Sequence, residues 1–130
     1  MTLFRHETEK ARIGRLGEEA ALALLKKAGL KGGAQNWRRG PYELDLVAEG
    51  RGVLCFVEVK TRRAGSLTTP EEALTPHKIR SLQRAARAFL ADSGTKYDGY
   101  SVQFDLVAVE HNDEGLFSAE RIEDAFDCSW

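Results

Sequence analysis

Two neighbouring segments, 42–50 and 53–61, most constrain the fold of this chain, because both have the pattern of β-strands and only a tight turn separates them. The first, YELDLVAEG, alternates apolar and polar residues, and the second, VLCFVEVKT, is rich in β-branched and apolar side chains. The turn sequence EGRG contains two glycines, which suit the backbone of a short hairpin loop. We therefore predict an antiparallel β-hairpin.

Helical segments are predicted before and after this hairpin. Residues 11–28 repeat apolar side chains at helical spacing, and Gly29 is well placed to end that helix. Thr75 and Pro76 are typical of the N-cap and first position of a second helix, which we expect to end before the sequence DSGT.

Three further segments show strand patterns, the last of them short and weak: 34–38, 100–110 and 121–126. The stretch between the hairpin and the second helix has the composition of a loop, with one helical turn beginning at Pro70. The resulting order is α–β–β–β–α–β. This order predicts an α/β fold, a mixed central sheet flanked by helices, in a single domain spanning residues 1–130.

The composition is that of an ordinary soluble protein, with 42% hydrophobic and 30% charged residues. No apolar run approaches the about 20 residues needed to cross a bilayer, and the first residues lack the apolar core of a signal peptide. We therefore expect a cytoplasmic protein with no membrane partner. Cys55 and Cys128 form no CxxC pair and the three histidines are scattered, which argues against a disulfide or a zinc site.

The net charge of −1 conceals an asymmetry along the chain. Residues 1–96 carry 18 Lys and Arg against 11 Asp and Glu, whereas residues 97–130 carry 1 against 9. These balances of +7 and −8 allow a basic face that binds a polyanion. Chance clustering together with an acidic C-terminal segment explains the same numbers equally well.

Glu58 and Lys60 stand two residues apart in the apolar segment 53–61, and in a strand they point to the same face. A buried charge needs a partner or a water-filled cleft. Pairing around the turn can bring Asp45 next to Glu58, and two carboxylates beside a lysine suit a hard cation such as Mg²⁺. The alternative is an edge strand with a solvated outer face, on which Glu58 and Lys60 form a surface ion pair.

The first predicted helix can add another acid. At about 100° per residue, Glu18 borders the apolar stripe and can face a sheet. Glu19 points to the opposite side with Arg15 and Lys26. Only Glu18 is therefore a candidate for the site.

Several blocks along the chain resemble the YraN-like family of small bacterial proteins. The blocks are GRLGEEAA, NWRRGPYELDLVAEG, FVEVKTRR, TPEEALTPHKIRSLQRAARAFL and QFDLVAVE. They occur in the family's order and cover nearly the whole chain, from Gly14 to about Phe126. Members of that family resemble the restriction-endonuclease-like superfamily, in particular Holliday-junction resolvases. The resemblance implies a restriction-endonuclease-like αβββαβ core and a metal-dependent nuclease site.

The resemblance also implies roles for individual residues. Asp45 and Glu58 match the two carboxylates that hold the metal, and Lys60 matches the catalytic lysine. The main-chain carbonyl of Val59 joins the metal ligands, and Glu18 matches the extra acid that resolvase-like members place beside the metal. The implied cofactor is Mg²⁺ or Mn²⁺, and the implied products carry a 5′-phosphate and a 3′-hydroxyl.

Other residues have plainer explanations. Tyr42 stands where the family usually has glycine, which can alter the local backbone or substrate access. Trp37 could stack on a base, but we expect it in the core. Asp105 could join the site or pair with a buried arginine, and we expect the structural pairing. Helix capping accounts for Thr75, and ordinary solvation accounts for Lys78.

Basic residues flank the acidic pair in the sequence, where contacts to phosphates are expected. The candidates for nucleic-acid binding are Arg38, Arg39, Arg62, Arg63, Lys78, Arg80, Arg84 and Arg87. Ordinary solvated surface is the alternative for all of them.

The leading hypothesis is a metal-dependent DNA endonuclease that prefers branched or otherwise unusual DNA structures. A homodimer is compatible with that function. The second hypothesis is a non-catalytic nucleic-acid-binding module on a nuclease fold, acting with DNA repair or recombination partners. The third is an interaction protein whose charged strand is an ordinary sheet edge.

Overall fold

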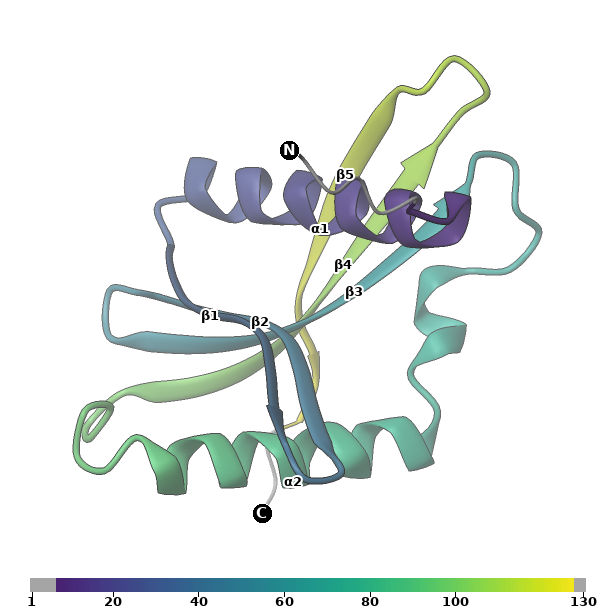
Figure 1. Ribbon diagram of the computed structural model, residues 1–130. Coiled ribbons are helices and arrows are strands. Elements are labelled where there is room, and N and C mark those ends of the chain that lie inside the picture. Colours follow the sequence, from purple (N-terminus) through teal and green to yellow (C-terminus); the bar gives the residue numbers. More distant parts are fainter. Residues whose placement is uncertain (1–6, 128–130) are drawn as a thin grey trace, which may run out of the picture.

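A five-stranded mixed sheet lies between two helices that cover its opposite faces (Figure 1). The computed structural model describes residues 7–127. The elements are α1 (Glu9–Lys27), β1 (Lys31–Arg39), β2 (Tyr42–Gly50), β3 (Val53–Arg63), the 3₁₀ turn η1 (Pro70–Ala73), α2 (Pro76–Asp92), β4 (Ser101–His111) and β5 (Phe117–Phe126). This architecture confirms the predicted mixed α/β class.

The predicted hairpin is confirmed and forms part of the sheet interior. β2 and β3 pair antiparallel, with Leu46 opposite Val57. Arg51 and Gly52 in the turn both have positive φ, as a tight hairpin turn requires. The strand order is β1-β2-β3-β4-β5, so β3 is not an edge strand of the sheet. β3 and β4 run parallel, and α2 lies in the crossover between them.

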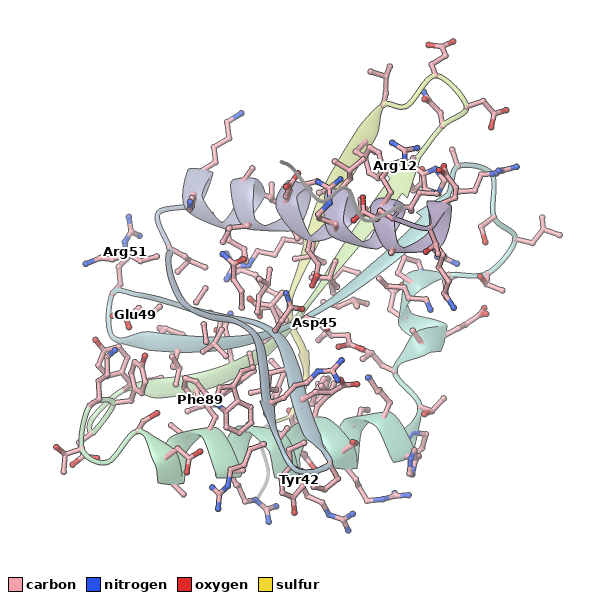
Figure 2. The ribbon with its side chains drawn as sticks, viewed as in Figure 1. Arg12, Tyr42, Asp45, Glu49, Arg51 and Phe89 are labelled. Carbon is pink, nitrogen blue, oxygen red and sulfur yellow. The ribbon has the colours of Figure 1, made fainter. Side chains whose placement is uncertain are left out.

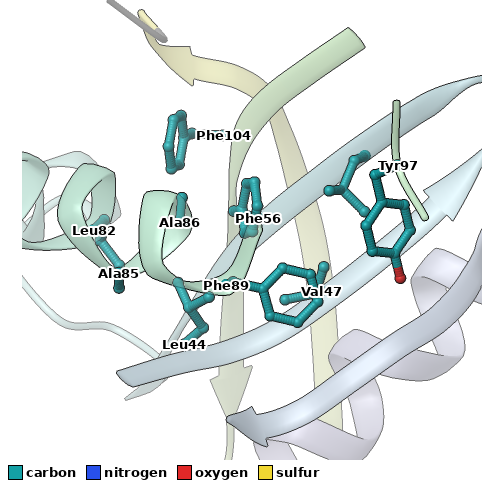
Figure 3. Close-up of a cluster of buried hydrophobic side chains, with 10 residues drawn as sticks. Leu44, Val47, Phe56, Leu82, Ala85, Ala86, Phe89, Tyr97 and Phe104 are labelled. Carbon is teal, nitrogen blue, oxygen red and sulfur yellow. The ribbon is translucent and has the colours of Figure 1, made fainter. Parts of the chain in front are cut away.

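Each helix covers its own apolar cluster. Phe56 and Phe89 lie in the cluster of apolar side chains between α2 and the sheet (Figure 3). Their rings meet edge to face at 5.7 Å. Trp37 also meets Phe89 edge to face, at 5.5 Å, which confirms its predicted core role. On the other face, Ala21 and Leu25 of α1 pack against the apolar side chains of β2, β3 and β4.

Two elements differ from the sequence prediction. α1 begins at Glu9 rather than at residue 11, because the Thr8 side chain caps it by accepting a hydrogen bond from the Ala11 amide at 3.1 Å. β5 is a strand of 10 residues, whereas only the weak segment 121–126 was expected. Half of its residues are polar, and it pairs antiparallel with β4.

Asp105 is buried within β4, with 1% of its surface exposed. Its carboxylate accepts hydrogen bonds from the Arg121 guanidinium at 2.8 and 3.0 Å, from the Gln103 amide at 2.9 Å and from the Asp124 main chain at 3.0 Å. Arg121 and Asp124 belong to β5. The predicted structural role is therefore confirmed, and Asp105 fastens β5 to β4.

The structure bears on the expected absence of a disulfide and of a membrane segment only within residues 7–127. Cys55 is buried in β3, and burial is the main cause that raises the pKa of its thiol to about 12, so it behaves as an inert core residue. Cys128 and His6 lie outside the described residues. No helix within residues 7–127 is both long and apolar enough to cross a membrane.

Gly17→Ala is expected to destabilise the protein by about 1–3 kcal/mol, because a methyl group there would lie 2.1 Å from the Thr61 hydroxyl where α1 crosses β3. Gly14→Ala is the matched control in the same helix. A methyl group at Gly14 meets no atom within 4 Å, so its helix propensity should stabilise the protein by about 0.5–1 kcal/mol. Urea unfolding of both variants measures the difference, and equal changes would contradict the close contact of α1 with β3.

Candidate active site

The β2 strand changes its orientation at Asp45. Leu44 packs in the cluster under α2, while Leu46 packs in the cluster under α1. In a regular strand, residues two apart lie on the same face, so the strand must twist sharply between them. On β1, Asn36 stands between the partners of Leu44 and Leu46 and has a φ of 49°, in the left-handed region that asparagine tolerates. β1 and β2 are thus both irregular at the level of Asp45.

Asp45 lies near the middle of the molecule, whereas Tyr42 lies beside α2, at the turn between β1 and β2 (Figure 2). Tyr42 is half-buried and packs against the α2 cluster.

The antiparallel pairing of β2 with β3 reaches only to Val57, and β3 continues beyond it paired with β4. Asp45 fills the edge that β2 leaves open, because its Oδ2 accepts a hydrogen bond from the Val59 amide at 2.9 Å. In a strand, the N–H and C=O of one residue point to the same edge. The Val59 carbonyl is therefore on the same side of β3 as Asp45, as its predicted role as a metal ligand requires.

Glu58 lies next to Asp45 and is nearly buried, with 13% of its side chain exposed. The pKa of Glu58 is raised to about 7, mainly by burial and then by the charge of Asp45 and a hydrogen bond with it, while the Lys78 ammonium acts in the opposite direction. The two predicted carboxylates therefore do meet, and they repel each other. A cation placed between them would relieve this repulsion.

A cleft of about 660 Å³ opens between α1 and this part of the sheet, and Glu18, Asp45, Val59 and Lys60 line it. Burial raises the pKa of Glu18, the charge of Asp45 adds to that rise, and a hydrogen bond with the Asn36 side chain opposes it. Glu18 thus faces the sheet as predicted.

The neighbouring glutamate behaves as the helical period indicates. Glu19 pairs with Arg15 at 3.4 Å on the exposed side of α1. The sequence was therefore sufficient to choose between the two acids.

The acids do not form a closed metal cage. Across residues 7–127, no three His, Cys, Asp or Glu side chains converge as a group able to hold a metal ion. Asp45 lies between Glu58, which reaches it from the side of α2, and Glu18, which reaches it from α1. Two carboxylates and a main-chain carbonyl still fit Mg²⁺ or Mn²⁺, since Mg²⁺ is commonly held by one or two carboxylates, with water and phosphate oxygens completing its shell.

Lys78 is the basic candidate that reaches the acidic pair. Its Nζ lies 3.0 Å from Glu58 Oε2, so the expectation of an ordinary solvated lysine is wrong. Burial opposes the charge on Lys78, but the Glu58 carboxylate outweighs this effect and the pKa of Lys78 lies above its ordinary value.

The other basic candidates lie away from the acids or have partners of their own. Arg38 pairs with Glu43 at 3.2 Å and Arg39 with Asp92 at 2.7 Å, and all four side chains are exposed. Arg62 binds Thr68 in the loop that follows β3. Arg63, Arg80, Arg84 and Arg87 are also exposed.

The sequence did not predict that Asn36 belongs to the site, and it placed Lys78 among the phosphate contacts or on the solvated surface rather than beside Glu58. Asn36 bonds Glu18 and bends β1, and its only signal was a residue of low β-propensity within a strand segment. Lys78 had a clearer signal. It stands in the first turn of α2, where a positive charge opposes the helix dipole. Such a local conflict often marks a functional position.

Comparison with known proteins places the chain in a family. The model of the family described as "Uncharacterised protein family UPF0102" matches residues 17–109. A UPF0102 protein of Nitratidesulfovibrio vulgaris is 45% identical over 123 residues, covering 95% of this chain and 86% of the relative. A UPF0102 protein of Symbiobacterium thermophilum is 42% identical over 115 residues, covering 88% and 96%. The chain therefore belongs to the UPF0102 family, the YraN-like family that its sequence blocks resemble.

Proposed function

We propose that this protein is a metal-dependent DNA endonuclease with a restriction-endonuclease-like core and a preference for branched DNA. The element order from α1 to β4 is the αβββαβ order expected for such a core. The observation that carries the proposal is the position of Asp45, which binds the Val59 amide at 2.9 Å and raises the pKa of the adjacent Glu58. Lys60 lines the same cleft as Asp45. The adjacency of Asp45 to Glu58, and the shared cleft of Asp45 and Lys60, support the proposal.

In the proposed mechanism, Asp45, Glu58 and the Val59 carbonyl would hold Mg²⁺ or Mn²⁺, which would supply Lewis acidity to the scissile phosphate and lower the pKa of water. Lys60 donates hydrogen bonds to the attacking water or to a phosphate oxygen and stabilises the negative charge that develops there. Glu18 accepts hydrogen bonds from water on the α1 side of the cleft. Attack of water at phosphorus breaks the bond to the 3′-oxygen and leaves a 5′-phosphate and a 3′-hydroxyl.

Exposed arginines provide the proposed contacts to the DNA backbone. Arg38 and Arg39 extend from β1, and Arg80 and Arg84 from α2. The ion pairs of the first two are exposed and worth less than about 1 kcal/mol each, so phosphates can replace their partners. Phosphate contacts position DNA without reading its bases, and we therefore expect a preference for DNA structure over sequence. A four-way junction offers two equivalent strands, which suits a homodimer with two sites.

A second candidate is a non-catalytic nucleic-acid-binding module that works with repair or recombination partners. The observation that favours it is the state of Glu58, which is paired with Lys78 while no three-acid group forms across residues 7–127. In this reading, the acidic pair and its lysine hold the fold together, and only the exposed arginines meet DNA.

Incubation of the purified protein with four-way junctions, supercoiled plasmid and single strands in Mg²⁺ or Mn²⁺ tests the choice. We expect junction cleavage, and Asp45→Asn and Lys60→Met should each reduce its rate about 100- to 1000-fold, because each removes a group that stabilises the transition state. Glu49→Gln, an acid on the same strand that bonds Tyr100, is the matched control and should cut normally.

Cleavage that persists unchanged in Asp45→Asn and Lys60→Met would contradict the proposed site. Binding of junctions with strong salt dependence but without cutting would favour the binding module. Absence of DNA binding at low salt would contradict both functions.

A further inference from the structure

Lys78 forms an ion pair that joins α2 to β3 at the acidic pair of Asp45 and Glu58. Its ammonium lies 3.0 Å from Glu58 Oε2, and its side chain is 37% exposed against 13% for Glu58. The lysine comes from α2 and the glutamate from β3, so the pair joins the helix to the sheet. One end of the contact is therefore nearly buried and the other is open to solvent.

The start of α2 holds this lysine in position. Thr75 Oγ1 accepts a hydrogen bond from the Lys78 amide at 3.1 Å, and Pro76 occupies the first helical position. The cap thus fixes the backbone from which the side chain extends. A lysine in the first helical turn is unfavourable beside the positive end of the helix dipole. The acidic pair supplies the compensating attraction, since Glu58, Asp45 and Glu43 all favour the charged form of Lys78.

We propose that Lys78 is the resident counter-cation of the Asp45–Glu58 pair, and that it leaves Glu58 when a divalent cation binds there. This inference rests on the metal site of the proposed function. Lys78 and the divalent cation compete for the same carboxylate, so Lys78 lowers the cation affinity of the free protein. Because 37% of the lysine side chain is already exposed, its ammonium can move into solvent and does not remain as a buried, unpaired charge.

The competing explanation is an ion pair that only pins α2 to β3. The two explanations agree that loss of Lys78 lowers the stability of the metal-free protein, because Glu58 loses its partner. They differ in the effect on cation binding. Competition requires that removal of Lys78 strengthens binding, whereas a purely structural pair leaves the affinity unchanged or weakens it.

The test measures Mn²⁺ binding to the free protein, without DNA, by the electron paramagnetic resonance signal of unbound Mn²⁺. Lys78→Met is expected to bind Mn²⁺ about tenfold more tightly than the wild type, a typical coupling between two ligands of linked sites. Lys78→Arg keeps the charge and should stay within about twofold of the wild type. Lys27→Met, which removes an exposed lysine from the last turn of α1, is the matched control and should also stay within about twofold.

A second readout is the rise in melting temperature caused by Mn²⁺, which should be larger for Lys78→Met than for the wild type. Lys78→Gln serves the same purpose if methionine beside Glu58 impairs folding. Suppose that the wild type binds Mn²⁺, that Asp45→Asn does not, and that Lys78→Met and Lys78→Gln bind it no more tightly than the wild type. This result would overturn the role of Lys78 and leave the metal site standing. Absence of Mn²⁺ binding by the wild type and by both Lys78 variants would overturn the metal site and the inference together.

Discussion

Asp105→Ala is expected to lower the free energy of unfolding by about 3–5 kcal/mol, because it leaves a nearly buried guanidinium without its partner. Arg121 donates to Asp105 at 2.8 and 3.0 Å, and only 16% of its side chain is exposed. The Gln103 amide and the Asp124 main-chain N–H lose their acceptor at the same time. Urea unfolding near pH 7 measures the loss, and hydrogen exchange should accelerate most in β5.

Glu123→Ala is the matched control for this prediction. Glu123 also pairs with Arg121, at 3.3 Å, but 64% of its side chain is exposed, so its loss should cost less than about 1 kcal/mol. If Asp105→Ala were as mild as Glu123→Ala, the buried pair would not be what fastens β5 to the sheet. The stability of this polar edge strand would then need another source.

The parts of the fold that the sequence predicted depend on local signals. The glycine-containing turn places β2 beside β3, and Thr75 caps α2 by accepting a hydrogen bond from the Lys78 amide at 3.1 Å. The helical period alone separates Glu18 from Glu19. In each case the deciding residues lie within a few positions of one another, so a pattern along the chain contains the information.

The parts that the sequence did not predict depend on contacts between distant segments. β2 twists at Asp45, and Asn36 on the neighbouring strand β1 has a left-handed backbone conformation. Neither residue type requires such a conformation. β5 is too polar for a clear strand pattern and forms because β4 provides its pairing partner and Asp105 its anchor. The partner of Lys78 lies on another element, and only the conflict with the helix dipole indicated a special role.

Glu58→Gln is expected to stabilise the metal-free protein by about 3 kcal/mol at pH 8 and to change its stability little at pH 4. The pKa of Glu58 is raised to about 7 in the folded protein, mainly by burial and then by Asp45, from an ordinary value of 4.5. The folded state therefore binds a proton more tightly than the unfolded state, and each tenfold difference in proton affinity corresponds to about 1.4 kcal/mol. The stability of the wild type falls on this account as the pH rises from 4.5 to about 7.

Glutamine mimics the protonated acid and removes this fall, so the difference between variant and wild type should be near zero below pH 4.5 and reach its full size above pH 7. Urea unfolding across this range measures it. Titrating groups away from Asp45, Glu58 and Lys78 are common to both proteins and cancel in the difference. Glu71→Gln, at an exposed acid in η1, is the control and should differ from the wild type by less than about 0.5 kcal/mol at every pH.

Divalent cations connect this prediction to function. At pH 8, Mn²⁺ should raise the melting temperature of the wild type, because a cation bound between Asp45 and Glu58 relieves their repulsion. It should have little effect on Glu58→Gln, which is already stabilised and lacks one of the two carboxylates. A variant that is more stable than the wild type and yet inactive would show that the acidic pair is kept at a cost to folding, as expected of a site selected for chemistry. A Glu58→Gln protein that is less stable than the wild type at pH 8 would instead show that the pair with Lys78 exists to hold the fold.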